Sequence, residues 1–113
     1  MKSIFFRSED TSFESVDQGV NRKILGYDQN IMMVQVDFEK DATGALHRHP
    51  HAQSTYVLSG IFDVTIEGET KVLKEGDCFV VPGNCLHGVY CKQKGSLIDA
   101  FSPAREDFLK TGK

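Results

Sequence analysis

The sequence predicts an all-β domain with one short helix near its C-terminal end. Two observations predict the sheet. Apolar and polar residues alternate with a period of two in several segments, and turn residues divide these segments about every 8–12 residues. The third observation is that the only helical signal lies after residue 101. Because 113 residues suffice for one hydrophobic core, we expect a single domain over 1–113, folded as a sandwich or barrel.

The predicted strands follow one another from residue 31 onward. In 31–39 and in 61–68 every second residue is apolar over much of the segment, as in a strand with one buried face. The segment 67–70 (EGET) contains a glycine and predicts a hairpin turn into a strand at 71–77. Further short strands are expected at the apolar segments 55–60, 78–83, 86–92 and 96–102.

A helix is predicted over about 103–110. Ser102 is a good N-cap residue, Pro103 suits the first helical position, and two acidic residues complement the positive end of the helix dipole. Arg105 breaks this pattern, because a cation in the first turn is unfavourable by about 0.3–1 kcal/mol. A residue that breaks a local rule without a local gain is a candidate functional residue.

Composition narrows the possible partners and the compartment. The chain is 40% hydrophobic and 26% charged, with a net charge of −3 and no basic block, so neither nucleic acid nor a membrane surface is an expected partner. The first 16 residues predict neither a signal peptide nor a membrane span. Cys78, Cys85 and Cys91 are odd in number and lack a CxxC spacing, which favours a reducing cytoplasm and unpaired thiols.

The histidines predict a metal site. His47, His49 and His51 lie within five residues, and Gln53 follows at the same spacing. Residues two apart in a strand project from the same face, so the imidazoles of His47 and His49 lie side by side. If the strand that carries His87 pairs with this segment, three imidazoles and one carbonyl oxygen meet. Such a set suits one divalent transition metal: Zn, Ni, Fe, Co or Mn.

These residues resemble the two motifs of the cupin superfamily. The first motif spans 44–60 and matches at Gly44, His47, His49, Gln53 and Gly60; the second spans 76–91 and matches at Gly76, Pro82 and His87. The chain departs from the usual pattern in four places: Gly44 lies closer to His47 than usual, Gln53 replaces a glutamate, Asn84 a turn glycine, and Cys91 an asparagine. The resemblance implies a small single-domain jelly-roll barrel.

A narrower resemblance covers almost the whole chain. The segments RKILGY, MMVQVDFE, GALHRHPHAQSTYVLSG and DAFSPAREDFL are similar to the pectin-degradation cupins that linearise 4,5-unsaturated uronates. This resemblance implies an isomerase- or lyase-like enzyme that opens the ring to 5-keto-4-deoxyuronate. The implied metal ligands are His47, His49, Gln53 and His87, and the implied catalytic residues are Asp99, Phe101 and Arg105.

The chemistry of the residues agrees with a small anionic sugar as substrate. An amide at Gln53 leaves a divalent ion its full charge of +2, which attracts anions. Asp99 interrupts an apolar run, and a carboxylate on an inward face needs a partner or a proton. We expect Asp99 to shuttle a proton and Arg105 to bind the substrate carboxylate. Phe101 is expected to wall the substrate pocket.

Other readings of single residues stay open. His51 and Tyr56 are expected to line the substrate pocket, with metal ligation as the alternative for His51 and ordinary core packing for Tyr56. Arg105 could instead form a surface salt bridge with an acidic neighbour, Glu106 or Asp107. A thiolate of Cys85 or Cys91 could ligate the metal, although inert cysteine is the simpler interpretation.

Two other functions are compatible with a three-histidine cupin: a metal-dependent dioxygenase, and a sugar-binding protein without catalysis. Oxygen consumption separates the first from a redox-neutral isomerisation, and binding without turnover identifies the second. Small cupins pair through edge strands, so a homodimer that covers the exposed sheet edges is expected.

Overall fold

The structure, a computed structural model, describes residues 4–109. This part of the chain contains eight strands and two short helices. The N-terminal helix η1 covers Ser8–Asp10 and the C-terminal helix α1 covers Glu106–Leu109. The strands are β1 (Glu14–Asp17), β2 (Val20–Tyr27), β3 (Met32–Phe38), β4 (Thr43–His47), β5 (Ala52–Ile66), β6 (Glu69–Lys74), β7 (Cys78–Val81) and β8 (His87–Ser102). The predicted all-β class with one C-terminal helix is confirmed.

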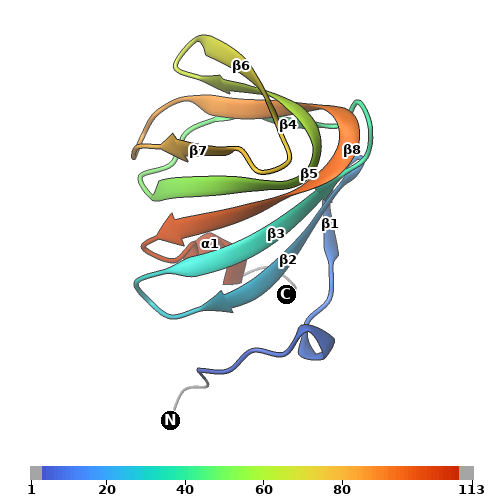
Figure 1. Cartoon of the computed structure of the whole chain (residues 1–113). Coiled ribbons are helices and arrows are strands. Elements are labelled where there is room, and N and C mark those ends of the chain that lie inside the picture. The colour runs from blue at the N-terminus through green and yellow to red at the C-terminus, as the bar shows by residue number, and fades with distance from the viewer. Residues whose placement is uncertain (1–3, 110–113) are drawn as a thin grey trace.

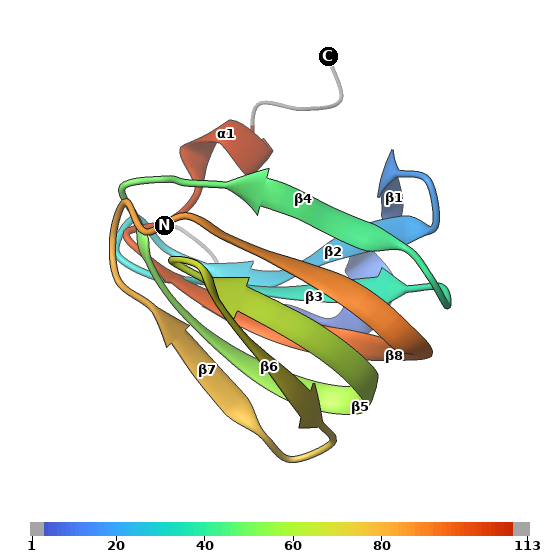
Figure 2. The same cartoon turned by 90° about the horizontal axis from the view of Figure 1, so that it is seen from above.

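The strands form one antiparallel sheet that curls over on itself (Figure 1). The order is β1-β2-β3-β8-β5-β6, while β4 pairs with β8 and β7 pairs with β5. Seen from above, β4 lies on the opposite side of the fold from β7 (Figure 2). The pairings described do not join the edge strands β1 and β6, so the ladder is open and the predicted closed barrel is not observed.

β5 and β8 hold the two halves of the sheet together, because each crosses both. Residues 52–59 of β5 pair with 96–102 of β8, and residues 61–66 pair with 87–93. The bend between the halves lies at Gly60, where φ is +87° and an added Cβ would lie 2.6 Å from the carbonyl oxygen of Gln93. Only glycine fits such a position. The strands predicted separately at 55–60 and 61–68 are therefore one bent strand, as are those at 86–92 and 96–102.

The predicted turns have the expected backbone. Glu67 and Gly68 join β5 to β6 with φ of 48° and 85°, the signs that a two-residue hairpin turn of type I′ requires. Asn84, which replaces the motif's turn glycine, has a φ of 68°, so the substitution is tolerated as its side chain predicts.

The apolar residues of the period-two segments form the core. Val34 and Phe38 in β3, and Phe62 and Val64 in β5, are all buried. Phe38 and Phe62 meet edge to face, with ring centroids 5.3 Å apart. The alternation at 31–39 and 61–68 is thus confirmed. Cys78, in contrast, is exposed at the start of β7 and does not belong to the core.

The C-terminal helix begins later than predicted. Ser102 is the last residue of β8, and its hydroxyl donates to the carbonyl oxygen of Asn30 instead of capping the helix. α1 begins at Glu106, so Arg105 precedes it and is not placed in its first turn. Phe108 packs its ring against Phe101, with centroids 5.7 Å apart, which confirms that the helix docks on the body. The expected end at 110 lies outside the described residues.

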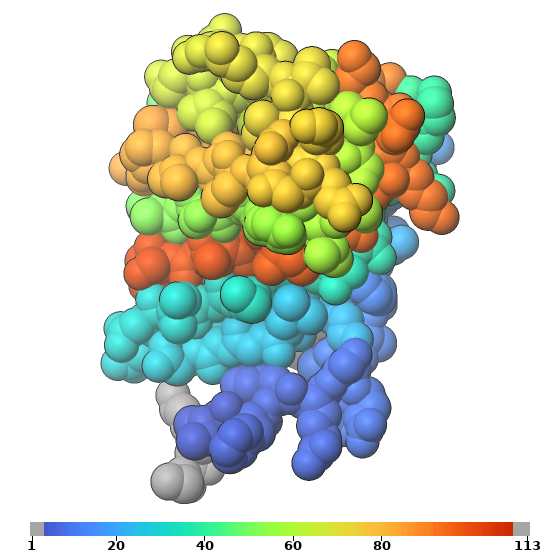
Figure 3. Space-filling view, in the orientation of Figure 1, coloured from blue at the N-terminus to red at the C-terminus, as the bar shows by residue number. Residues whose placement is uncertain are grey.

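The N-terminal segment contacts β2, since the rings of Phe6 and Tyr27 lie 5.6 Å apart and Lys23 Nζ donates to Ser8 Oγ. In the space-filling view it forms a lobe below β2 (Figure 3). Ile4 and Phe5 are 75% and 83% exposed. The predicted homodimer stays a prediction. Within 4–109 no helix combines the length and the apolar character that a membrane-spanning helix needs.

Candidate active site

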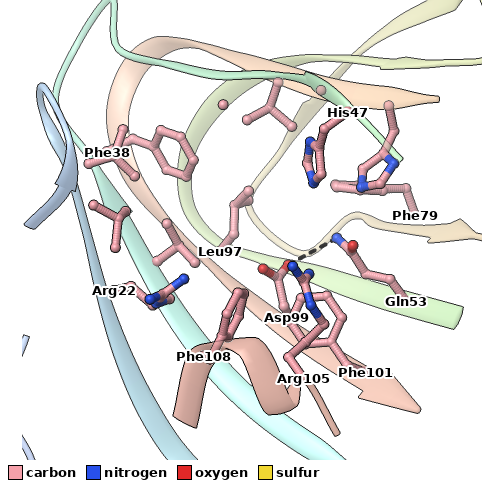
Figure 4. Close-up of a pocket in the computed structure, with 17 residues that line it drawn as sticks. Arg22, Phe38, His47, Gln53, Phe79, Leu97, Asp99, Phe101, Arg105 and Phe108 are labelled. Atoms are coloured by element: carbon pink, nitrogen blue, oxygen red, sulfur yellow. Dashed lines mark hydrogen bonds between the residues drawn. The ribbon is translucent and has the colours of Figure 1, made fainter. Parts of the chain in front are cut away.

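The curled sheet encloses a cavity of about 250 Å³ that opens beside α1 (Figure 4). Its walls are largely apolar, and Phe38, Phe79 and Leu97 are among them. Its polar lining residues come from β2, β4, β5, β8 and the segment before α1: Arg22, His47, Gln53, His87, Asp99 and Arg105. Five of the seven residues implied as ligands or catalytic groups are therefore polar members of one cavity wall, and Phe101 lines the same space.

Three histidines meet at one end of this cavity. His47 ends β4, His49 follows in the connecting loop, and His87 begins β8, where it pairs with His47. Their potential ligand nitrogens all lie within 4.8 Å of one another. The ring centroids are 4.4 Å apart for His47 and His87, and 4.8 Å for His49 and His87. The predicted convergence of two distant segments is present.

Backbone carbonyls determine the tautomer of each ring. The Nδ1 atom of each histidine lies within hydrogen-bonding distance of a carbonyl oxygen: His47 to Ala45 at 2.8 Å, His49 to His51 at 3.0 Å and His87 to Cys85 at 2.9 Å. Because a carbonyl oxygen only accepts, Nδ1 carries the proton and donates. Nε2 of the neutral ring therefore keeps its lone pair, the arrangement that metal-binding histidines use.

Burial favours the neutral form of two of these rings. Desolvation lowers the pKa of His49, and the positive charge of Arg105 lowers it further. Desolvation also lowers the pKa of His87. The Nε2 atom of His87 is buried and has no hydrogen-bond partner among the described residues. An orphaned lone pair of this kind is costly unless a ligand takes it.

The amide of Gln53 is held with its oxygen toward the histidines. Its Nε2 donates to Thr55 Oγ1 at 2.9 Å and to Asp99 Oδ1 at 3.3 Å. Its Oε1 then lies 3.1 Å from Nε2 of His49. With the proton of His49 on Nδ1, two lone-pair atoms face each other across this distance, a contact that a cation between them would relieve.

The donor set therefore fits a metal ion. It offers three imidazole nitrogens and one amide oxygen, a combination typical of divalent transition metals and poor for Mg²⁺ or Ca²⁺. The possible metal-binding group found among the described residues consists of His47, His49 and His87, without His51 or a cysteine. The alternative ligands that the sequence left open are thus absent from this group.

Asp99 is a buried carboxyl group next to this donor set. It projects from β8 and is 9% exposed. Thr55 donates to its Oδ1 at 2.6 Å and Gln53 does so at 3.3 Å. Desolvation raises its pKa to about 6, although the bond from Thr55 and the charge of Arg105 oppose the rise. Asp99 can therefore exist in both the protonated and the ionised form near neutral pH, as a proton shuttle requires.

The raised pKa of Asp99 makes a prediction about stability. A carboxyl whose folded pKa of about 6 exceeds the unfolded 3.8 stabilises the fold below pH 4, and this contribution is lost as the pH rises through 6. We compare the unfolding free energy of Asp99→Asn with that of the wild type at each pH. As the pH rises from 4 to 7, we expect this difference to change by about 3 kcal/mol in favour of the variant. Urea unfolding of the metal-free proteins measures this gain, and a constant difference over that range would contradict it.

Arg105 forms the salt bridge that the sequence left as an alternative, and it also lines the cavity. Its guanidinium forms a two-bond salt bridge with Asp107, at 3.0 Å from Nε and 2.8 Å from Nη2. The side chain is nevertheless only 11% exposed, because it lies over the rings of Phe101 and Phe108, at 5.0 and 4.2 Å from their centroids. The guanidinium thus faces the cavity while Asp107 holds it from outside.

Two predicted pocket residues lie elsewhere. Tyr56 is 45% exposed and has the opposite parity in β5 to the inward residues Gln53 and Thr55, so its expected place in the pocket is wrong. The period-two rule already excludes it. His51 is next to the metal-binding group but lines a shallower hollow outside, together with Arg105 and Asp107. Its expected role in substrate binding stays a prediction.

Two polar residues of the site are absent from the sequence-based set. Thr55 is fully buried and bonds Asp99; its parity with Gln53 in β5 could have revealed it. Arg22 lines the cavity from β2, where it shares a strand face with the apolar residues Val20 and Ile24. A charged residue on an apolar strand face is the same signal that identified Asp99.

Comparison with known proteins agrees with the fold. Residues 34–99 match the family model described as Cupin domain. The chain is 45% identical over 107 residues to the pectin degradation protein KdgF of Dickeya dadantii (strain 3937), covering 93% of this chain and 97% of that protein.

Two solved structures are similar over nearly the whole chain. The structure of KdgF from Halomonas sp. is 38% identical with a TM-score of 0.88, covering 95% of this chain and 99% of the other. An RmlC-like cupin from Shewanella frigidimarina NCIMB 400 is 44% identical with a TM-score of 0.90, covering 95% and 96%. The chain therefore belongs to the cupin family and, within it, to the group that contains the pectin degradation protein KdgF.

Proposed function

We propose that this protein converts 4,5-unsaturated uronate monosaccharides into linear 5-keto-4-deoxyuronate during the breakdown of pectin or a related uronate polymer. The observation that carries the proposal is the meeting of a three-histidine donor set, Asp99 and Arg105 in one cavity. Relatedness to KdgF, named for pectin degradation, supports the substrate class. The cavity of about 250 Å³ suits a monosaccharide better than a longer chain, since drug-sized ligands use about 300–1,000 Å³.

Charge favours an anionic sugar. His47, His49, His87 and Gln53 would hold a divalent transition metal, which supplies Lewis acidity toward substrate oxygens. None of these four donors is anionic. Arg105 adds a positive guanidinium at the cavity wall, which also favours an anionic ligand.

The residues of the chain account for the proton transfers. Opening of the hemiacetal breaks the bond between C1 and the ring oxygen, giving an aldehyde at C1 and an enolate at C5. The hydroxyl proton at O1 is lost and a proton is gained at C4, so the formula does not change and no oxidant is needed. Asp99 can accept the first proton and deliver the second. Thr55 and Gln53 hold this carboxyl in place, while Phe101 excludes water from the reacting face.

Incubation with unsaturated monouronate released by a pectate lyase tests the proposal. We expect the ultraviolet absorbance of the conjugated enol ether to fall in the presence of metal-loaded protein, with a product of unchanged mass and no oxygen consumption. Protein treated with a chelator should be inactive and should recover on addition of metal.

The unsaturated disaccharide is a matched control substrate. Its unsaturated ring is glycosylated at C1 and has no free hemiacetal, so it should not react. Oxygen consumption would favour a dioxygenase, and tight binding of the monouronate without any turnover would favour a sugar-binding protein; either result contradicts the proposal.

A further inference from the structure

The cavity contains a second buried guanidinium besides that of Arg105. Arg22 projects from β2 into the wall, and its side chain is only 13% exposed. Its Nη2 donates to Glu14 Oε2 at 2.5 Å, whereas its Nε is buried with no acceptor among residues 4–109. A buried guanidinium with five donors and one ion pair is incompletely compensated, because the cost of removing a cation from water is recovered only by good partners.

Phe108 brings the two guanidinium groups together. The carbon centre of Arg22 lies 3.8 Å from the centroid of the Phe108 ring, and that of Arg105 lies 4.2 Å from it. Figure 4 shows Phe108 between them, so the two cations are at most 8.0 Å apart. The negative faces of one aromatic ring attract both groups and keep them beside the cavity.

The charges around this part of the cavity are unbalanced. The lining residues with a formal charge are Arg22, Arg105 and Asp99, so cationic side chains outnumber the acidic one. Asp107 lies outside the cavity and accepts two hydrogen bonds from Arg105, one from Nε and one from Nη2. Among the described residues, the ion-pair partner of Arg22 is Glu14, which lies on the edge strand β1 with its side chain 43% exposed. A ligand anion can replace Glu14 more readily than it can replace Asp107.

We propose that Arg22 is a substrate-binding residue that takes the carboxylate of the uronate, and that Glu14 holds its guanidinium in the free protein. This inference rests on the proposed function for the identity of the ligand. Arg22 then fixes the acidic end of the sugar in the part of the cavity beside Phe108. Arg105, to which the sequence assigned this role, and the donor set face the other oxygens of the sugar.

Arg22→Gln tests the assignment, with Lys23→Gln as the matched control. Lys23 is the next residue of β2, and its Nζ donates to Ser8 Oγ, so it faces the other side of the sheet. For unsaturated monouronate we expect Arg22→Gln to raise KM about tenfold or more with kcat within about threefold of the wild type. Lys23→Gln should change neither.

Calorimetric binding of galacturonate and galactose to metal-loaded protein supplies a readout that needs no turnover. Arg22→Gln should weaken galacturonate binding about tenfold and leave galactose unchanged. Glu14→Gln should tighten galacturonate binding severalfold, because Arg22 loses its competing partner. If the ion pair is merely structural, Arg22→Gln and Glu14→Gln should have similar effects and should weaken the binding of galacturonate and galactose equally. That pattern would overturn the assignment.

The outcomes separate this inference from the proposed function. If the wild type turns over the monouronate but Arg22→Gln binds galacturonate as tightly, the role of Arg22 is refuted and the reaction stands. If no turnover occurs but galacturonate binding still depends on Arg22, the carboxylate site stands and the reaction is refuted. Should Arg22→Gln fail to fold, Glu14→Gln decides, since binding no tighter than in the wild type refutes the role.

Discussion

Replacing Asp99 by Asn is expected to slow turnover of unsaturated monouronate by about 10²–10⁴-fold, the contribution typical of a general acid–base residue. The amide keeps the shape of the carboxyl and can still accept the bond from Thr55, but it cannot move a proton. Metal content should remain at the wild-type level. The measurement is steady-state loss of the enol-ether absorbance, together with elemental analysis of the same samples.

Asp37→Asn is the matched control for this prediction. Asp37 lies on β3 and also accepts side-chain hydrogen bonds, from Ser96 at 2.6 Å and Gln35 at 2.9 Å, but it does not line the cavity. This variant should retain activity within about threefold of the wild type. An Asp99→Asn protein with wild-type turnover would remove Asp99 from the mechanism. Unfolding cannot account for a loss, since the same substitution is expected to stabilise the metal-free protein at neutral pH.

Replacing His87 by Ala is expected to weaken metal binding by more than about 100-fold. Removing a residue that only hydrogen-bonds a metal ligand already lowers metal affinity by about 10–100-fold, and His87 is expected to be a ligand itself. His87 contributes the buried Nε2 that has no other partner among the described residues. Competition with a chromophoric chelator measures the affinity. A metal at about 100 times its dissociation constant stabilises a folded protein by about 2.7 kcal/mol, so the wild type should show a metal-dependent rise in Tm that His87→Ala lacks.

His51→Ala is the control for the metal prediction. It removes an imidazole next to the site, 5.6 Å from the ring of His49, without touching the group of three. It should bind one equivalent of metal with an affinity close to that of the wild type. If both variants lose metal equally, the assignment of the ligands is wrong.

The parity of the strand residues could be predicted from the sequence, and with it much of the site. His47 and His87 each stand out as polar residues in or next to apolar segments, and Asp99 interrupts an apolar run. Such signals are local, since the side a residue faces depends only on its position in its own strand. The same rule would have placed Thr55 inside and Tyr56 outside, so the failure at Tyr56 lay in applying the rule and not in the rule.

The start of the helix and the contact of Arg105 with the Phe108 ring could not be predicted in this way. Ser102 has the chemistry of an N-cap, but β8 continues through it because its residues pair with β5. Pairing across the sheet overrides a capping preference of about 1 kcal/mol. The sequence offered Asp107 as a partner of Arg105, but the guanidinium lies over Phe108 because the chain turns after β8, and no spacing in the sequence encodes that turn.

The strand-rich class, the faces of the strands and the kinds of donor atoms follow from the sequence alone. Which of these donors meet depends on the tertiary fold. Forty residues separate the segment that ends at His47 from His87, and only the pairing of β4 with β8 brings the two rings to 4.4 Å. It also decided that Arg22 and Arg105 share one aromatic ring. The physical reason is that periodicity is a property of one strand, whereas register and sheet curvature arise from long-range packing of the whole domain.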